Sequence, residues 1–135
     1  MNGVDIPHKM LSQDAYSQWL GIKILESQIG RVKVGMTIRK EMLNGFYKAH
    51  GGISFALADS AFAFAANTHG KHALTVETSI NHIEALNEGD YITAESVIEK
   101  KNSKLGFNII EVKRKEELVA LYKGVVYRTQ KDWEE

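Results

Sequence analysis

A single carboxylate in an otherwise apolar segment, Asp59, is the residue of this sequence best placed to do chemistry. Within residues 53–66, eleven of fourteen side chains are Ala, Ile, Leu or Phe, and this composition predicts a helix that is buried on all sides. The positions three and four residues from Asp59 carry only Phe and Ala. A charged carboxylate on such a face is costly unless it is paired. Asp59 is therefore a candidate catalytic group, and the alternative is a structural Asp bonded to backbone amides or to Ser60.

Two adjacent glycines at the start of the predicted helix, Gly51 and Gly52, form a second candidate site. Glycine lets the backbone approach a ligand closely, and the first N–H groups of a helix have no partner within the helix. These N–H groups can therefore receive a carbonyl oxygen or an anion. The alternative is a glycine-rich helix start without a ligand, and the tripeptide His50-Gly51-Gly52 alone does not separate the two.

The combination of these residues resembles hotdog-fold thioesterases of the phenylacetate-degradation (PaaI) type. In that family an HGG tripeptide opens the central helix and a carboxylate follows eight positions after the first glycine, as Asp59 follows Gly51. An Asn six residues before the His and a Ser or Thr on the strand after the helix complete the pattern, and Asn44 and Thr75 occupy those positions. The resemblance covers about residues 20–129 and is most specific between Asn44 and Thr75.

The resemblance implies an α+β fold of the hotdog type, in which an antiparallel sheet wraps around a long, buried central helix over about residues 51–69. It implies one domain over residues 1–135, with a core over about 21–130. This domain would form a homodimer with composite active sites, and two dimers would form a homotetramer. The implied activity is that of an acyl-CoA thioesterase that acts on aryl-acetyl or medium-chain acyl groups without a cofactor.

The resemblance also implies a role for each matching residue. The Gly51 N–H would hold the thioester oxygen, while Asp59 would act as a general base on water or attack directly as a nucleophile. Thr75 would orient Asp59 or the water, and Asn44 would position the reacting groups. The residues that we expect to contact the substrate or coenzyme A are His50, Gly52, Phe62 and Lys104. Residues 81–86 lack the proline that family members often carry, and we interpret this difference as bearing on substrate choice.

The spacing of Gly51 and Asp59 independently indicates that two chains share one site. Eight residues of helix separate the two groups by ~12 Å along the helix axis. Reacting groups must approach within roughly 3–3.5 Å, so one helix cannot bring both to the same carbonyl carbon. Two helices that run antiparallel across a two-fold axis can do so, and we therefore expect a homodimer.

The remaining elements are predicted from hydrophobic periodicity. Apolar side chains at helical spacing indicate a short amphipathic helix over about residues 9–20, which Gly21 can end. Asn44-Gly45 indicates a turn in the loop over residues 39–50. Alternating patterns predict strands at about residues 22–25, 31–38, 73–84, 90–100, 106–114 and 118–129.

The composition argues against several other classes of protein. The 17 basic and 17 acidic residues balance, so neither nucleic acid nor a membrane surface is an expected partner. The sequence has no cysteine, and its histidines lack metal-binding spacing, so we expect no metal and interpret His82 as a surface or loop histidine. The first twenty residues lack the apolar segment of a signal peptide, which predicts a cytoplasmic location.

Three other functions stay open at this point. A hotdog acyl-CoA hydratase or dehydratase would pair a His with a carboxylate on a helix, whereas His50 precedes the predicted helix. A non-catalytic acyl-CoA-binding protein would keep the fold without turnover. A plain structural oligomer would have no use for Asp59 in its apolar segment. Release of free thiol from CoA thioesters separates the enzyme from the binding protein.

Overall fold

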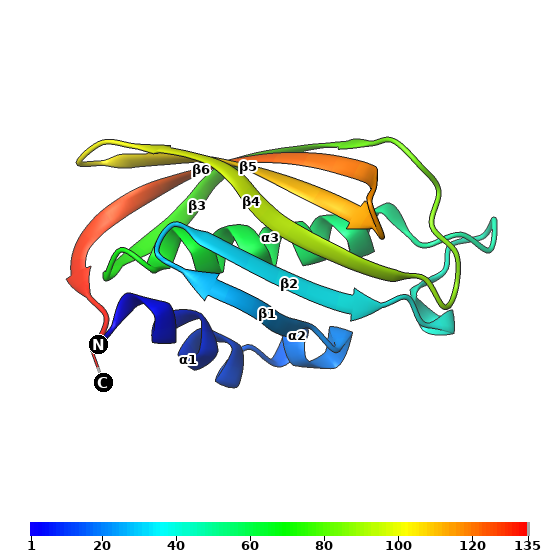
Figure 1. The fold of residues 1–135 in the computed structure, drawn as a ribbon, viewed down its shortest axis with the longest axis horizontal. Coiled ribbons are helices and arrows are strands. Elements are labelled where there is room, and N and C mark those ends of the chain that lie inside the picture. The colour runs from blue at the N-terminus through cyan, green and yellow to red at the C-terminus, as the bar shows by residue number, and fades with distance from the viewer. Residues whose placement is uncertain (135) are drawn as a thin grey trace.

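The central helix, α3, spans Gly51–Asn67 and is formed by the apolar segment. In the computed structural model, which describes residues 1–134, this helix lies buried beneath the sheet (Figure 1). His50 caps its N-terminus, because His50 Nδ1 accepts the Gly52 N–H at 2.9 Å. The helix ends before the expected position 69, since Thr68 closes the last turn by donating to Ala65 O. Neither α3 nor any other helix of the described residues is long and apolar enough to cross a membrane.

Six antiparallel strands form one curved sheet over α3 (Figure 1). The strands are β1 (Lys23–Gln28), β2 (Arg31–Thr37), β3 (Lys71–His82), β4 (Tyr91–Lys101), β5 (Leu105–Arg114) and β6 (Glu117–Asp132). Their order across the sheet is β1-β2-β4-β5-β6-β3, which places β3 at one edge beside β6. Buried and less buried positions alternate along β5, so that side chains such as Ile110 and Val112 join the core formed with α3. The predicted α+β layout, an antiparallel sheet wrapped around a buried helix, is confirmed.

The N-terminal segment forms two short helices instead of the single helix predicted over residues 9–20. The short elements are α1 (Ile6–Ser12), α2 (Ala15–Leu20) and the 3-10 turns Gly3–Asp5 and Lys40–Met42. Asp14 separates the two helices, because its Oδ1 accepts the Ser17 N–H at 3.0 Å and so caps α2. Gly21 ends α2 as predicted, in the left-handed conformation with φ 78°. Both helices pack against α3.

The loop between β2 and α3 carries Asn44 and lies against the connection between β3 and β4. Asn44 Oδ1 accepts the N–H of Phe46 at 2.8 Å and that of Lys48 at 3.3 Å, which builds the turn predicted at this position. The Ala49 N–H then donates to Leu86 O at 2.8 Å. These bonds fix the position of Asn44 relative to the start of α3.

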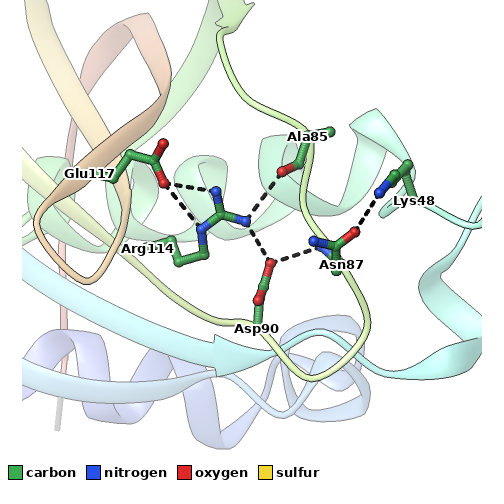
Figure 2. Close-up of polar contacts among 6 residues, drawn as sticks. All are labelled: Lys48, Ala85, Asn87, Asp90, Arg114 and Glu117. Carbon is green, nitrogen blue, oxygen red and sulfur yellow. Dashed lines mark hydrogen bonds and ion pairs between the residues drawn. The ribbon is translucent and has the colours of Figure 1, made fainter.

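A hydrogen-bonded network holds the connection between β3 and β4 in place (Figure 2). Arg114, at the end of β5, donates to Asp90 Oδ2 at 2.8 Å and to Glu117 Oε1 at 2.7 Å. Asp90 Oδ2 also accepts the Asn87 N–H at 2.8 Å, and Lys48 Nζ donates to Asn87 Oδ1 at 2.7 Å. The Asn87 N–H, and then Arg114, hold the pKa of the Asp90 carboxyl below its usual range. The network thus joins the loop before α3 to the chain that follows β3.

Candidate active site

Asp59 lies on α3 and is paired with a tyrosine of β6. The Tyr122 hydroxyl donates a hydrogen bond of 2.6 Å to Asp59 Oδ1. The Tyr122 side chain is completely buried, and the rings of Phe55 and Phe62 pack against it with centroid distances of 5.6 Å. Burial, and then the hydrogen bond to Asp59, raise the pKa of the Tyr122 phenol far above its usual range. Tyr122 therefore stays protonated and holds the carboxylate in one orientation.

Asp59 lines a cleft, and its second carboxylate oxygen is not held by Tyr122. Oδ2 makes no hydrogen bond within residues 1–134, and Asp59 borders a cleft of about 430 Å³ between α3 and the N-terminal helices, which we call the Asp59 cleft. Its lining residues are Met10, Asp14, Tyr16, Ser17, Gly52, Phe55, Ala56, Asp59, Ser60, Ala63 and Phe64. Asp59 therefore borders a cleft that is lined in large part by apolar side chains, with one carboxylate oxygen that makes no hydrogen bond to the described residues.

Ser60 does not pair with Asp59, in contrast to the structural alternative considered for that carboxylate. Ser60 Oγ lies 2.8 Å from Ser17 Oγ, and the Ser17 hydroxyl donates to Asp14 Oδ2 at 2.6 Å. Because an ionised carboxylate only accepts hydrogen bonds, Ser17 uses its proton on Asp14 and Ser60 donates to Ser17. These hydroxyls tie α2 to α3 and leave Tyr122 as the partner of Asp59.

The N-terminus of α3 presents the Gly51 N–H to a second cleft. Among residues 1–134 this N–H makes no hydrogen bond, whereas the Gly52 N–H is bonded to His50 Nδ1. The second cleft, of about 430 Å³, is called the Gly51 cleft. It is lined by Asn44, Phe46, Lys48, Ala49, Gly51, Ser54, His82, Ile83, Glu84, Ala85 and Leu86. The structure thus brings Asn44 and Gly51 together, while His50 and the N–H of Gly52 serve to cap the helix.

The residues expected to act on one substrate do not meet within one chain. Gly51 lines one cleft and Asp59 the other, and eight residues of α3 place ~12 Å between them along the helix axis. Thr75 is exposed on the edge strand β3, opposite Val126 of β6, and lines neither cleft. A single chain therefore holds the parts of the site in three separate places.

Two residues assigned to substrate contact lie away from both clefts. Phe62 is completely buried in the core, where its ring supports Tyr122. Lys104 belongs to the turn between β4 and β5, at the end of the molecule opposite the loop that carries Asn44 (Figure 1). In one chain, Phe62 is therefore a packing residue, and Lys104 is remote from both the Gly51 N–H and Asp59.

Comparison with known families now decides among the open functions. A sequence profile described as "Thioesterase superfamily" matches residues 48–121, more than half of the chain, and this span includes Gly51 and Asp59. The chain belongs to this superfamily.

Individual relatives show which type of thioesterase this chain resembles. The acyl-coenzyme A thioesterase PaaI of Escherichia coli is 36% identical over 122 residues, which are 90% of this chain and 87% of that protein. The structure of the E. coli PaaI protein matches with a TM-score of 0.93 at 32% identity, over 97% of this chain and 96% of that one. A mutant of the phenylacetic acid degradation protein PaaI of Thermus thermophilus matches with a TM-score of 0.83 at 34% identity, over 86% and 100% of the two chains. The chain is thus a hotdog-fold thioesterase of the PaaI type, a hydrolase that acts on thioester bonds.

Two polar residues next to the candidate catalytic groups were not predicted as site residues from the sequence. Tyr122 lies in a strand whose alternating pattern shows that it is buried but not that it passes over Asp59. His82, interpreted as a surface or loop histidine, is exposed as expected, but it ends β3 and lines the Gly51 cleft. The signal that could have found His82 is its place in residues 81–86, the segment in which this chain departs from the family pattern.

Proposed function

We propose that this thioesterase hydrolyses acyl-CoA substrates with aryl-acetyl or medium-chain acyl groups to the free acid and coenzyme A. The observation that carries the proposal is a Gly51 N–H without a partner in residues 1–134, together with an Asp59 carboxylate that Tyr122 fixes by one oxygen only. The activity named for the E. coli relative supports acyl-CoA as the substrate class. The pathway named for the T. thermophilus relative supports an aryl-acetyl group.

Gly51 is proposed to bind the thioester oxygen. Its N–H belongs to the first turn of α3, where the helix carries a partial positive charge. Negative charge gathers on the oxygen as the carbonyl carbon becomes tetrahedral, so this donor stabilises the transition state more than the substrate. Asn44 is proposed to position the same group through its side-chain amide, because its Oδ1 is already bonded to Phe46 and Lys48 while its Nδ2 makes no hydrogen bond within residues 1–134.

Asp59 is proposed to supply the reacting carboxylate. As a general base, Oδ2 takes a proton from a water molecule whose oxygen forms the new C–O bond, and the C–S bond then breaks. As a nucleophile, Oδ2 forms an acyl anhydride with Asp59, which water hydrolyses in a second step. In both routes the coenzyme A thiolate leaves with the electron pair of the C–S bond and takes up a proton. A strong general acid is unnecessary, because the pKa of a thiol is about 8.5.

A homodimer is proposed to bring the separate parts of the site together. β3 lies at the sheet edge for 12 residues and exposes 59% of Leu74 and 60% of Val76. An edge strand of this kind is a template for pairing with another strand. Pairing of β3 with its copy across a two-fold axis would bury these side chains and place Thr75 at the interface, where it can orient Asp59 or the water. Two such dimers form the proposed tetramer.

Release of free thiol from CoA thioesters tests this function. The wild type should release thiol from phenylacetyl-CoA or from medium-chain substrates. Asp59→Asn should lower kcat by at least ~100-fold, the usual scale for loss of a general base, with unchanged circular dichroism and assembly. Asp5→Asn, the same change at an exposed carboxylate, is the matched control and should keep wild-type turnover. The proposal fails if the wild type releases no thiol, and Asp59 loses its role if the assembled Asp59→Asn variant stays fully active.

A further inference from the structure

The side chain of His82 faces the backbone donor that we assign to the thioester oxygen. His82 is the last residue of β3, where it pairs with Ala120 of β6. Its Nε2 lies 3.2 Å, and its Cε1 3.5 Å, from the position that a Cβ atom would occupy on Gly51. The Gly51 nitrogen is bonded to the Cα that would carry this Cβ, so the imidazole and the N–H border the same small volume. His82 is exposed, so a ligand in the Gly51 cleft can reach it.

Ser54 sets the orientation of the imidazole. Its Oγ lies 3.3 Å from His82 Nδ1 and 3.2 Å from Gly51 O. The Ser54 side chain belongs to the first turns of α3 and is 4% exposed, so it is a fixed anchor. Nδ1 is thereby occupied, whereas Nε2 makes no hydrogen bond within residues 1–134. The Ser54 hydroxyl has one proton and two acceptors in range, Gly51 O and His82 Nδ1. Donation to Gly51 O makes Nδ1 the protonated nitrogen and leaves Nε2 as an acceptor. Donation to Nδ1 puts the ring proton on Nε2, which then presents an N–H beside Gly51, and a donor role for His82 requires this second arrangement.

We propose that His82 Nε2–H donates a second hydrogen bond to the thioester oxygen that the Gly51 N–H binds. This inference rests on the proposed function and adds a catalytic residue to it. Two donors that converge on one oxygen share the charge that develops there, and loss of one such donor typically lowers kcat by ~10²–10³-fold. No bond forms or breaks at His82 in this role, because the imidazole keeps its proton throughout.

The charged side chains of the Gly51 cleft are less suited to this position. Lys48 Nζ is bonded to Asn87 Oδ1 at 2.7 Å, on the side of the cleft formed by the connection between β3 and β4 (Figure 2). Glu84 accepts hydrogen bonds when it is ionised and so repels an oxygen that gains negative charge. His82 therefore combines donor chemistry with direct proximity to Gly51.

Substitutions of His82 test the contact in the full-length protein. His82→Phe keeps a ring of similar size without nitrogen atoms, and His82→Gln restores an N–H near the position of Nε2. We expect His82→Phe to lower kcat by roughly 30–300-fold with little change in KM, and His82→Gln to recover about tenfold of this loss. His8→Phe, the same change at an exposed histidine of α1, should leave kcat unchanged. A kcat of His82→Phe within about threefold of wild type would overturn the assignment.

Two substrate analogues separate a contact with the carbonyl oxygen from a structural role. A ketone analogue of the substrate, with CH₂ in place of sulfur, keeps the oxygen, and a thioether analogue lacks it. His82→Phe should weaken binding of the ketone by about tenfold and leave binding of the thioether unchanged. Equal weakening of both would show that His82 only shapes the cleft. If the wild type hydrolyses no thioester, the proposed function fails, but the two analogues still decide whether His82 contacts the carbonyl.

Discussion

The proposed division of the site between two chains can be tested by combining two variants that should be inactive, one of which removes the Gly51 N–H. Gly51 is the first residue of α3, a position that tolerates proline well. His50, which precedes it, has the extended backbone (φ −60°, ψ 140°) that proline favours in its predecessor. Gly51→Pro therefore removes a donor that makes no bond within residues 1–134, with little demand on the helix. Gly51→Ala is the matched control, because it adds the same Cβ beside His82 and keeps the N–H.

The expected magnitudes follow from the geometry of α3. Each homodimer of Gly51→Pro or Asp59→Asn carries one lesion in every site and should lose ~10²-fold or more in kcat. In a mixed dimer, positions 51 and 59 of one helix belong to different sites, because ~12 Å separates them along the helix axis. One site then contains both lesions and the other contains neither, so a mixed dimer keeps half of the wild-type activity. Random assortment makes about half of the dimers mixed, so the mixture should recover about a quarter of the wild-type rate.

The assay is thiol release by co-refolded mixtures in which each variant carries a different affinity tag. Sequential purification on both tags isolates the mixed dimers, and circular dichroism verifies the helix content of the Gly51→Pro parent. Gly51→Ala places the same Cβ against His82 Nε2, so the two variants share any loss from that contact, and the higher kcat expected of Gly51→Ala measures the contribution of the N–H. Doubly tagged mixed dimers that release no thiol, although both parents are folded, would refute the composite site and require one chain to bridge the separation along α3.

Three further predictions concern the groups around the reacting atoms and the loop network. Thr75→Ala and Asn44→Ala should each lower kcat less than Asp59→Asn does, because the roles proposed for Thr75 and Asn44 orient groups and supply no base, and steady-state kinetics on one substrate ranks the three variants. Tyr122→Phe removes the hydroxyl that holds Asp59 and keeps the packed ring, so kcat should fall ~10-fold with KM unchanged, and an unaltered kcat would show that Asp59 needs no such partner. Asp90→Asn should lower the Tm by roughly 2–5 °C at pH 7. The pKa of the Asp90 carboxyl is lowered in the folded protein, so ionised Asp90 stabilises the fold above its unfolded pKa of about 3.9. This stabilisation is lost as the pH falls through the lower folded pKa, so the Tm values of the wild type and Asp90→Asn should converge in acid.

The elements were predictable where one local pattern decides the outcome. Residues 53–66 offer no polar face, so only a buried helix fits them, and α3 begins at the predicted residue. The last four strands lie within a few residues of their predicted bounds, because side-chain alternation fixes which residues face α3. The prediction of one continuous helix over residues 9–20 is wrong, because Asp14 caps the start of α2 and does not continue α1. This capping preference outweighs the apolar spacing.

The contacts of the candidate site were less predictable, because they depend on sheet order. The position of Tyr122 over Asp59 follows from the crossing of β6 over α3, and β6 is the last of the strands in sequence. The proximity of the His82 imidazole to Gly51 depends on where β3 ends relative to the start of α3. A single sequence gives the alternation within each strand but not the neighbours of that strand. Family resemblance supplied Gly51, Asp59, Asn44 and Thr75, but neither of these two partners.

The placement of Gly51 and Asp59 in separate clefts of one helix has a consequence for the behaviour of the enzyme at low concentration. If each site draws one group from each chain, a folded monomer is inactive, and activity follows the population of dimers. Well below the dissociation constant of the dimer, the rate should then fall with the square of the protein concentration, and the specific activity should fall in proportion to it. A newly made chain would hydrolyse no thioesters until it met a second copy, so the rate of synthesis would set the onset of activity.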